Sequence, residues 1–150
     1  MKACLFHDTS AALHDRRVFE IVEDAYNSQG KVLIFAESDK RAAEIDRSLW
    51  IIRQDSFIPH KIAQEYDRDI NVPVAIVTAE WNPLQAAILI ADGHCSVEFA
   101  NGFNIIHEFV YRSSPEIQET CRIRYRAYRD ANIPVEYLKT GVWKGNVPGI

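Results

Sequence analysis

The sequence has little cysteine, no long apolar run and no excess of basic residues. Its three cysteines are widely spaced and form no C-x-x-C pair, which favours buried thiols in a reducing compartment over a disulfide framework. Its longest apolar runs, 72–77 and 84–91, fall far short of the roughly 20 residues that cross a bilayer. The 17 basic and 21 acidic side chains give a net charge of −4, which argues against nucleic-acid binding over the whole surface. We therefore expect a cytoplasmic protein without a membrane anchor.

Glycine-rich phosphate loops are also missing. A phosphate-binding loop needs G-x-x-x-x-G-K-[ST] between a strand and a helix, whereas Gly30 and Lys31 open a predicted strand. The first predicted strand leads into residues 7–12, which contain no glycine that would let the backbone approach a pyrophosphate. The five histidines include no i, i+4 pair of the kind that ligates a metal on a helix. The sequence therefore predicts no cofactor and no metal.

The composition is that of one globular domain spanning residues 1–150. With 47% hydrophobic and 25% charged residues, a chain of this length can bury a core without disulfides or metals. Apolar runs predict strands at 3–6, 31–36, 72–78, 84–91 and 104–110. Periodicity and caps predict helices at 13–28, from Ser38 to about Trp50, and from Ser114 to about Asn132. A turn at 80–83 predicts a hairpin, so we expect an α/β sheet that is mostly parallel with some antiparallel pairing.

The last predicted helix carries a basic and aromatic segment, residues 121–129, within an otherwise acidic chain. At about 100° per residue, Arg122, Arg126 and Arg129 form one stripe, and Tyr125 flanks it. The stripe is either a solvated face that pairs with Glu119 and Asp130, or an anion site. Arginine forks bind carboxylates, so an aromatic edge beside them suits an acidic peptide with an apolar anchor. Single-stranded nucleic acid stacked on the tyrosine is a third interpretation, which the net charge weakens.

The adjoining arc of the same helix is apolar and is expected to pack on the sheet. Its members are Ile117, Cys121, Tyr128 and Ala131. Arg124 falls inside this arc, where an unpaired charge would be costly. Its position calls for a bent helix or a partner carboxylate.

An enzyme hypothesis rests on His7 and Asp8. These residues follow the first predicted strand, and α/β folds usually bind ligands at the carboxyl ends of their strands. A small α/β enzyme or nucleotide-binding protein that uses this pair is therefore the alternative to a binding protein.

Three blocks of sequence, none strict alone, are specific in combination. The first is 31–36 with the following helix as far as Leu49 and Trp50. The second is Ser-Phe-Ile-Pro-His at 56–60, and the third is Arg-Tyr-Arg-Ala-Tyr-Arg at 124–129 with Trp143 and Lys144 near the end. Together they resemble the chi subunit of bacterial DNA polymerase III holoenzyme. The resemblance implies a three-layer Rossmann-like α/β sheet with helices on both faces, no nucleotide-binding glycine loop and no catalysis of its own.

Members of that family are accessory proteins of the clamp loader that grip the acidic C-terminal tail of single-stranded DNA-binding protein. The resemblance assigns the tail site to Val110, Arg122, Tyr125, Arg126 and Arg129. Arg122 would take the terminal carboxylate of the tail, and Tyr125 would border the pocket for its last aromatic residue. Gln118 stands where some relatives carry a basic residue, which implies a weaker hold on the acidic half of the tail.

The family's second partner surface falls on the loop around Phe57. Phe57 and Pro59, with Trp50, would supply apolar contacts to psi, the small subunit that joins chi to the clamp loader, or to a helicase-like protein. The alternative is that Phe57 and Trp50 only cover the edge of the core. The resemblance thus predicts an adaptor that is monomeric on its own and reaches DNA only indirectly.

Overall fold

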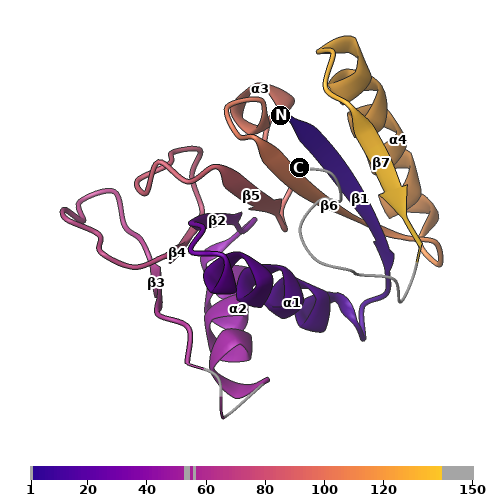
Figure 1. Ribbon diagram of the computed structural model, residues 1–150. Coiled ribbons are helices and arrows are strands. Elements are labelled where there is room, and N and C mark those ends of the chain that lie inside the picture. Colours follow the sequence, from indigo (N-terminus) through magenta and orange to yellow (C-terminus); the bar gives the residue numbers. More distant parts are fainter. Residues whose placement is uncertain (1, 53–54, 56, 140–150) are drawn as a thin grey trace.

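The computed structural model of the chain describes residues 2–52, 55 and 57–139. Within them, one sheet has the strand order β3-β4-β2-β5-β6-β1-β7, with helices on both faces (Figure 1). The strands are β1 (Ala3–Thr9), β2 (Val32–Phe35), β3 (His60–Ile62), β4 (Val74–Val77), β5 (Ile88–Ala91), β6 (Ile105–Tyr111) and β7 (Val135–Leu138). The helices are α1 (His14–Asn27), α2 (Asp39–Ile51), α3 (Val97–Ala100) and α4 (Pro115–Asp130). The predicted Rossmann-like α/β fold is confirmed, whereas Ser56, Trp143 and Lys144 of the sequence blocks lie outside the described residues.

The hairpin predicted from the turn at 80–83 is wrong. β4 and β5 each pair in parallel with β2, which lies between them, and every strand pair among the described residues is parallel. The extended run expected from residue 84 is broken at Gln85, whose φ of 53° lies in the left-handed region. Asn82 bonds both the N–H and the C=O of Ala86, which closes the connection into a turn. Residues 78–87 therefore cross over β2 instead of returning beside β4.

Two apolar clusters fill the space on either side of the sheet. On one face, α1 and α2 bury side chains such as Ile21 and Ile45. On the other face, α4 buries Tyr128. β1 contributes to both clusters, because successive side chains of a strand point to opposite faces: Leu5 joins the first cluster and Phe6 the second. The result is three layers, with α4 and the edge strand β7 side by side at one end of the molecule (Figure 1).

The start of α4 follows its predicted signals, and its end corrects one prediction. The Ser114 hydroxyl accepts a hydrogen bond from the Ile117 N–H, and Pro115 occupies the first turn, where a missing N–H costs nothing. Ala131 is exposed instead of packing on the sheet. The chain leaves the helix at Asn132, whose φ is 61°, and this turn brings Ile133 into the core in its place.

All three cysteines are buried and free, as predicted. Burial raises the pKa of Cys95 and Cys121 to about 11, so neither thiol is a nucleophile near neutral pH. Among the described residues, the helices are all too short or too polar to span a membrane.

Candidate functional site

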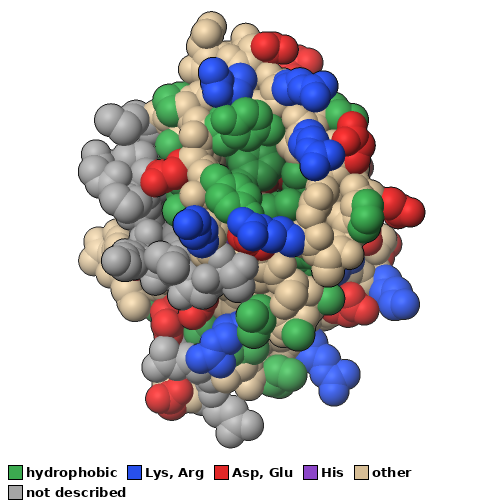
Figure 2. Space-filling model, turned by 90° about the vertical axis from the view of Figure 1, so that its right-hand side faces the viewer, with side chains coloured by type: hydrophobic (Ala, Val, Ile, Leu, Met, Phe, Trp, Pro, Cys, Tyr) green, Lys and Arg blue, Asp and Glu red, His purple; other side chains and the backbone are tan. Residues whose placement is uncertain are grey.

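A pocket of about 470 Å³ opens between α4, β7 and the ends of β1 and β6. Its lining combines apolar and basic side chains: Phe6, Val110, Arg112, Gln118, Cys121, Arg122, Tyr125, Arg126 and Tyr137. Figure 2 looks onto this end of the molecule and shows a hollowed apolar patch with Lys and Arg side chains around it. The pocket therefore has the layout of a site for an anionic ligand that carries an apolar group.

The floor of the pocket is aromatic and rests on the core. Phe6 lies under Tyr125, with ring centroids 6.0 Å apart, and meets the buried Tyr128 edge-on at 6.1 Å. Val110 and Cys121 are both largely buried and complete the apolar base. Tyr125 keeps 39% of its surface exposed, so its ring can still contact a ligand.

The α4 side of the pocket carries the arginines. Arg122 forms an ion pair with Glu119 at 3.2 Å, but both side chains are well exposed, so a stronger anionic ligand can displace the glutamate. Arg126 is exposed and makes no ion pair with the described residues. Arg129 lies apart from the pocket lining; its guanidinium is 5.8 Å from the Tyr125 ring centre and donates to the Tyr125 hydroxyl at 3.2 Å. The predicted stripe thus divides into two pocket arginines and one that supports Tyr125.

The opposite side of the pocket holds a polar cluster of three residues. Tyr137 of β7 donates to the Asp8 carboxylate of β1 at 2.7 Å. Arg112, just after β6, pairs with the same carboxylate through Nε at 2.7 Å and donates to the Tyr137 hydroxyl at 3.1 Å. These bonds to Tyr137 and Asp8 raise the pKa of Arg112. Gln118 in turn donates to the Arg112 carbonyl.

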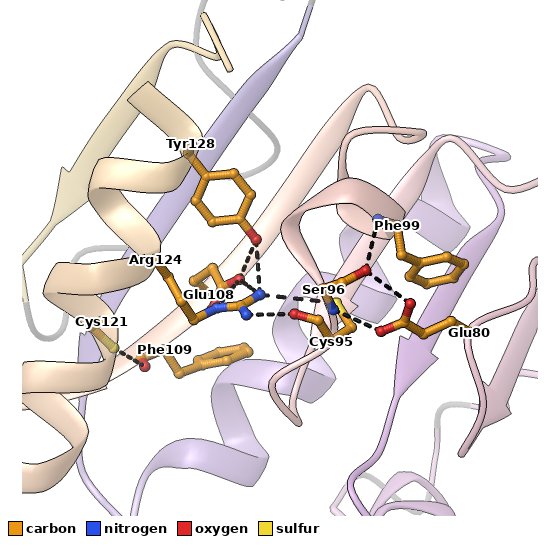
Figure 3. A network of polar contacts seen from close by, with 9 residues as sticks. All are labelled: Glu80, Cys95, Ser96, Phe99, Glu108, Phe109, Cys121, Arg124 and Tyr128. Carbon is orange, nitrogen blue, oxygen red and sulfur yellow. Dashed lines mark hydrogen bonds and ion pairs between the residues drawn. The ribbon is translucent and has the colours of Figure 1, made fainter. Parts of the chain in front are cut away.

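A second polar cluster holds α4 against the sheet (Figure 3). Arg124 pairs with Glu108 of β6 through both Nε and Nη2, and it also donates to the Cys95 carbonyl. The Tyr128 hydroxyl donates to the same carboxylate. Burial together with the adjacent Glu108 charge raises the pKa of Tyr128, which keeps this hydroxyl protonated. Arg124, which was out of place in the predicted apolar arc, has the partner carboxylate that its position required.

The chain matches a known protein family over most of its length. The profile of the family described as "DNA polymerase III chi subunit, HolC" matches residues 1–136. The chain belongs to the chi subunit family of DNA polymerase III. The DNA polymerase III subunit chi of Escherichia coli strain K12 is 33% identical over 135 residues, which is 87% of this chain and 86% of that protein. The DNA polymerase III subunit chi of Pseudomonas aeruginosa is 28% identical, over 77% of this chain and 79% of that protein.

Solved structures share the fold at low sequence identity. One is the C-terminal domain of Saccharomyces cerevisiae Dbp5 in a complex with Gle1 and IP6, with a TM-score of 0.61 and 15% identity. The match covers 95% of this chain and 93% of that one, which supports the α/β fold and nothing further. As a member of the chi family, this chain is an accessory subunit in DNA replication and does not catalyse polymerisation.

Four of the five residues assigned to the tail site from the chi resemblance line one pocket. They are Val110, Arg122, Tyr125 and Arg126. Sequence reasoning missed the other wall. Phe6 was expected only as a core residue, and Arg112 and Tyr137 lie on segments that carry no motif. The acidic Asp8 beside these residues, at the end of β1, was the one available signal.

His7 and Asp8, the alternative catalytic pair, do not share a site in this chi family member. β1 continues to Thr9, so both residues lie within the strand and point to opposite faces. His7 is fully buried against His107 and Arg17, while Asp8 is held by Arg112 and Tyr137. The prediction that they follow the strand is therefore wrong, and because they lie on opposite faces of the sheet the two side chains cannot act on one ligand.

A polar cavity of about 420 Å³ does lie at the carboxyl ends of the strands. Its centre is Asp92, which accepts from Arg41 at 2.8 Å and lies 2.6 Å from His14. Although burial opposes ionisation, the bonds from Arg41 and His14 lower the pKa of Asp92 to about 2. The described residues contain no group of three or more His, Cys, Asp or Glu placed to hold a metal.

The second predicted surface is an exposed aromatic pair. The ring centroids of Trp50, at the end of α2, and Phe57 lie 5.4 Å apart, and Trp50 also contacts the buried His60 ring at a tilted angle, with centroids 4.4 Å apart. Phe57 is 64% exposed and Trp50 is 45% exposed, while Pro59 is half-buried and Ile58 is buried. These exposures argue against the interpretation that Phe57 and Trp50 only cover the core.

Proposed function

We propose that this chi subunit is a cytoplasmic adaptor whose pocket binds the acidic C-terminal tail of single-stranded DNA-binding protein. The observation that carries the proposal is the pocket of about 470 Å³ with an aromatic floor and arginines at its rim. A peptide end offers an α-carboxylate and a side chain together, and the two halves of the pocket suit those two groups. The net charge of −4 disfavours direct binding of DNA, so DNA is reached through the tail-bearing partner.

The roles within the site follow from position. Arg122 takes the terminal carboxylate, because it is an exposed guanidinium directly beside the aromatic floor. Tyr125 and Val110 border the space for the terminal aromatic side chain, and Arg126 adds charge one turn further along α4. Arg129 contributes through Tyr125. An affinity near micromolar, about −8 kcal/mol, is sufficient, because a DNA-coating oligomer presents several tails to one assembly.

The second half of the proposal concerns the aromatic surface formed by Trp50, Phe57 and Pro59. Exposed aromatic side chains that already pack against one another bind an apolar partner with little further loss of conformational freedom. We assign this surface to psi or a helicase-like protein. The two surfaces use separate elements, α4 with β7 on one side and α2 with the segment before β3 on the other, so both partners can be held at once.

The test is fluorescence anisotropy of a labelled tail peptide from the organism's single-stranded DNA-binding protein. Saturable binding by the parent protein, weakened at least about tenfold in Arg122→Ala, supports the proposal. Arg68→Ala removes an equal charge from an exposed loop at the other edge of the sheet and is expected to bind as the parent does. Absence of binding by the parent, or equal binding by Arg122→Ala, would refute it.

A bare single-stranded oligonucleotide is the control ligand. The adaptor proposal predicts little retention of the oligonucleotide at low salt, whereas binding as tight as that of the tail peptide would favour direct DNA binding.

A further inference from the structure

We infer that Arg112, held in place by Asp8 and Tyr137, is a specificity-determining residue of the pocket that binds an acidic side chain of the peptide upstream of its terminal residue. This inference rests on the proposed function and deepens it, because it assigns a ligand group to the wall of the pocket that faces α4. Arg112 lies just after β6 and lines the same pocket as Arg122.

The contacts of Arg112 fix the base of the side chain and leave its outer edge open. Nε donates a hydrogen bond to the Tyr137 hydroxyl at 3.1 Å and lies 2.7 Å from the Asp8 carboxylate, and neither Nη group donates a hydrogen bond within the described part of the chain. The Cζ atom of the Arg112 guanidinium lies 5.8 Å from the centre of the Tyr137 ring. The two Nη groups, with four N–H donors, therefore remain for a ligand, and they are accessible because 66% of the side chain is exposed. Because Nε of Arg112 is already held, part of the entropy cost of ordering this side chain on a ligand is met in the free protein.

The Asp8 carboxylate is well placed to act as this anchor. It is buried, with 5% of its side chain exposed, and it accepts from Tyr137 of the neighbouring strand as well as pairing with Arg112. Among the residues that the structure describes, three arginines and two carboxylates (Arg112, Arg122, Arg126, Asp8 and Glu119) lie at the pocket, so their summed charge is positive. Asp8 thus orients Arg112 without cancelling the attraction for an anion.

The spacing between the two walls suits an extended peptide. Gln118 donates to the Arg112 carbonyl, which places Arg112 beside the first turn of α4. Arg122 lies one turn further on, about 6 Å along the helix axis. An extended peptide advances about 3.3 Å per residue, so a terminal carboxylate at Arg122 places side chains two or three residues upstream near Arg112. Arg112 and Arg122 therefore bind different carboxylates of one ligand.

The experiment is a double-mutant cycle between the protein and three peptides. The first peptide is the acidic tail peptide, the second is the same peptide with a C-terminal amide, and the third has its acidic side chains replaced by amides. Arg112→Gln is expected to lower the affinity for the first two peptides by the same factor, about threefold to tenfold. It should bind the third peptide as tightly as the parent does. Arg122→Ala is expected to bind the first and second peptides with equal affinity, because it lacks the group that takes the terminal carboxylate.

A positioning variant and a matched control complete the design. Tyr137→Phe keeps the ring beside the pocket and removes the hydroxyl that links Asp8 to Arg112, so it should lose part of the same charge selectivity. Arg112→Lys keeps the charge without the anchored fork and should retain part of the affinity. Arg68→Gln, with equal charge loss at the far edge of the sheet, should bind all three peptides normally.

The outcomes separate this inference from the proposed function. The inference is overturned if Arg112→Gln weakens the neutralised peptide as much as the acidic one, if it changes nothing, or if its effect depends on the terminal amide. In each of these cases binding by the parent protein leaves the tail site standing. Failure of the parent to bind any of the three peptides would overturn the proposed function and this inference together.

Discussion

Arg124 and Glu108 form a buried ion pair that ties the middle of α4 to β6. Their side chains are 9% and 1% exposed, and the Tyr128 hydroxyl donates to the same carboxylate. Tyr128 packs on Phe6, which forms the pocket floor. The helix that carries the pocket arginines is therefore fixed to the sheet by charge as well as by apolar contact.

Removing one partner of this pair is expected to be strongly destabilising. Glu108→Gln leaves the Arg124 guanidinium buried without a counter-charge, and the free energy of unfolding should fall by about 3–5 kcal/mol. Urea unfolding followed by far-UV circular dichroism measures this change. Glu119→Gln breaks only the exposed ion pair to Arg122, so it should cost less than about 1 kcal/mol. Equal stability losses in the two variants would contradict the prediction.

The double variant Glu108→Leu/Arg124→Met tests the same relationship from the other direction. It removes both charges and replaces them with apolar side chains of similar length, so most of the stability lost in the single variant should return. A double variant that is less stable than Glu108→Gln would show that the unpaired charge is not the main cost, and that packing or the lost partners of the Tyr128 hydroxyl and the Cys95 carbonyl dominate.

Sequence patterns predicted the elements that are long or strongly periodic. α4, its Ser114 cap and the α2 cap at Ser38 were found, because their signals are local. β3 and β7 were missed, since strands of three and four residues at the edges of the sheet have too few buried positions to show a period.

The candidate site was predictable to the extent that it lies on one helix. Arg122, Tyr125 and Arg126 follow from helical spacing, and Val110 from the family resemblance. Arg112 and Tyr137 were not predictable, because the chain brings them to α4 through strand pairing between β1, β6 and β7. The Asp8 carboxylate joins them from a third segment, and no local pattern encodes such a meeting.

The buried histidines predict a dependence of stability on pH. Arg17 donates to Nδ1 of His7 at 2.9 Å, so the His7 proton lies on Nε2 and is donated to His107 at 2.8 Å. Burial lowers the pKa of both rings, with a further contribution from Arg17, and the pKa of His107 falls to about 3. Well above pH 6.5 both histidines are neutral in the folded and the unfolded chain, so their titration does not reduce stability there.

As the pH falls from about 6.5 towards 3, the unfolded chain binds protons that the folded chain does not. Each histidine then lowers the free energy of unfolding by up to about 1.4 kcal/mol per pH unit. Between pH 6 and pH 5, His107→Gln should reduce the slope of the free energy of unfolding against pH by the contribution of one proton. Urea unfolding at a series of pH values measures this slope. An unaltered slope in His107→Gln would show that His107 is already protonated in the folded protein.

Arg129 is expected to affect peptide binding only through Tyr125. Its contacts are a hydrogen bond to the Tyr125 hydroxyl and a cation–π contact with the ring, both at the protein surface. Arg129→Gln should therefore weaken the tail peptide by about twofold to fivefold, less than Arg122→Ala. Combining Arg129→Gln with Tyr125→Ala should add nothing to Tyr125→Ala alone, because both remove the same contact. Additive losses in the anisotropy titration would mean that Arg129 meets the peptide directly.

The two proposed partner surfaces should be separable by mutation. Phe57→Ala removes a ring that is 64% exposed and packs against Trp50, so it should impair binding of psi or the helicase-like partner and leave binding of the tail peptide unaffected. Arg122→Ala should show the reverse pattern, because α4 packs on β6 and β7 whereas Phe57 precedes β3 at the opposite edge of the sheet. Pull-down of the second partner and peptide anisotropy, made on the same two preparations, measure both effects.

A matched aromatic control distinguishes a binding surface from general surface apolarity. Tyr66 is 80% exposed in the connection between β3 and β4, near the same edge of the sheet, and Tyr66→Ala removes a ring of similar size. We expect this variant to keep both partners. The assignment of Phe57 fails if Phe57→Ala still captures the second partner, or if Tyr66→Ala loses it equally, since the effect would then not depend on the Trp50–Phe57 pair.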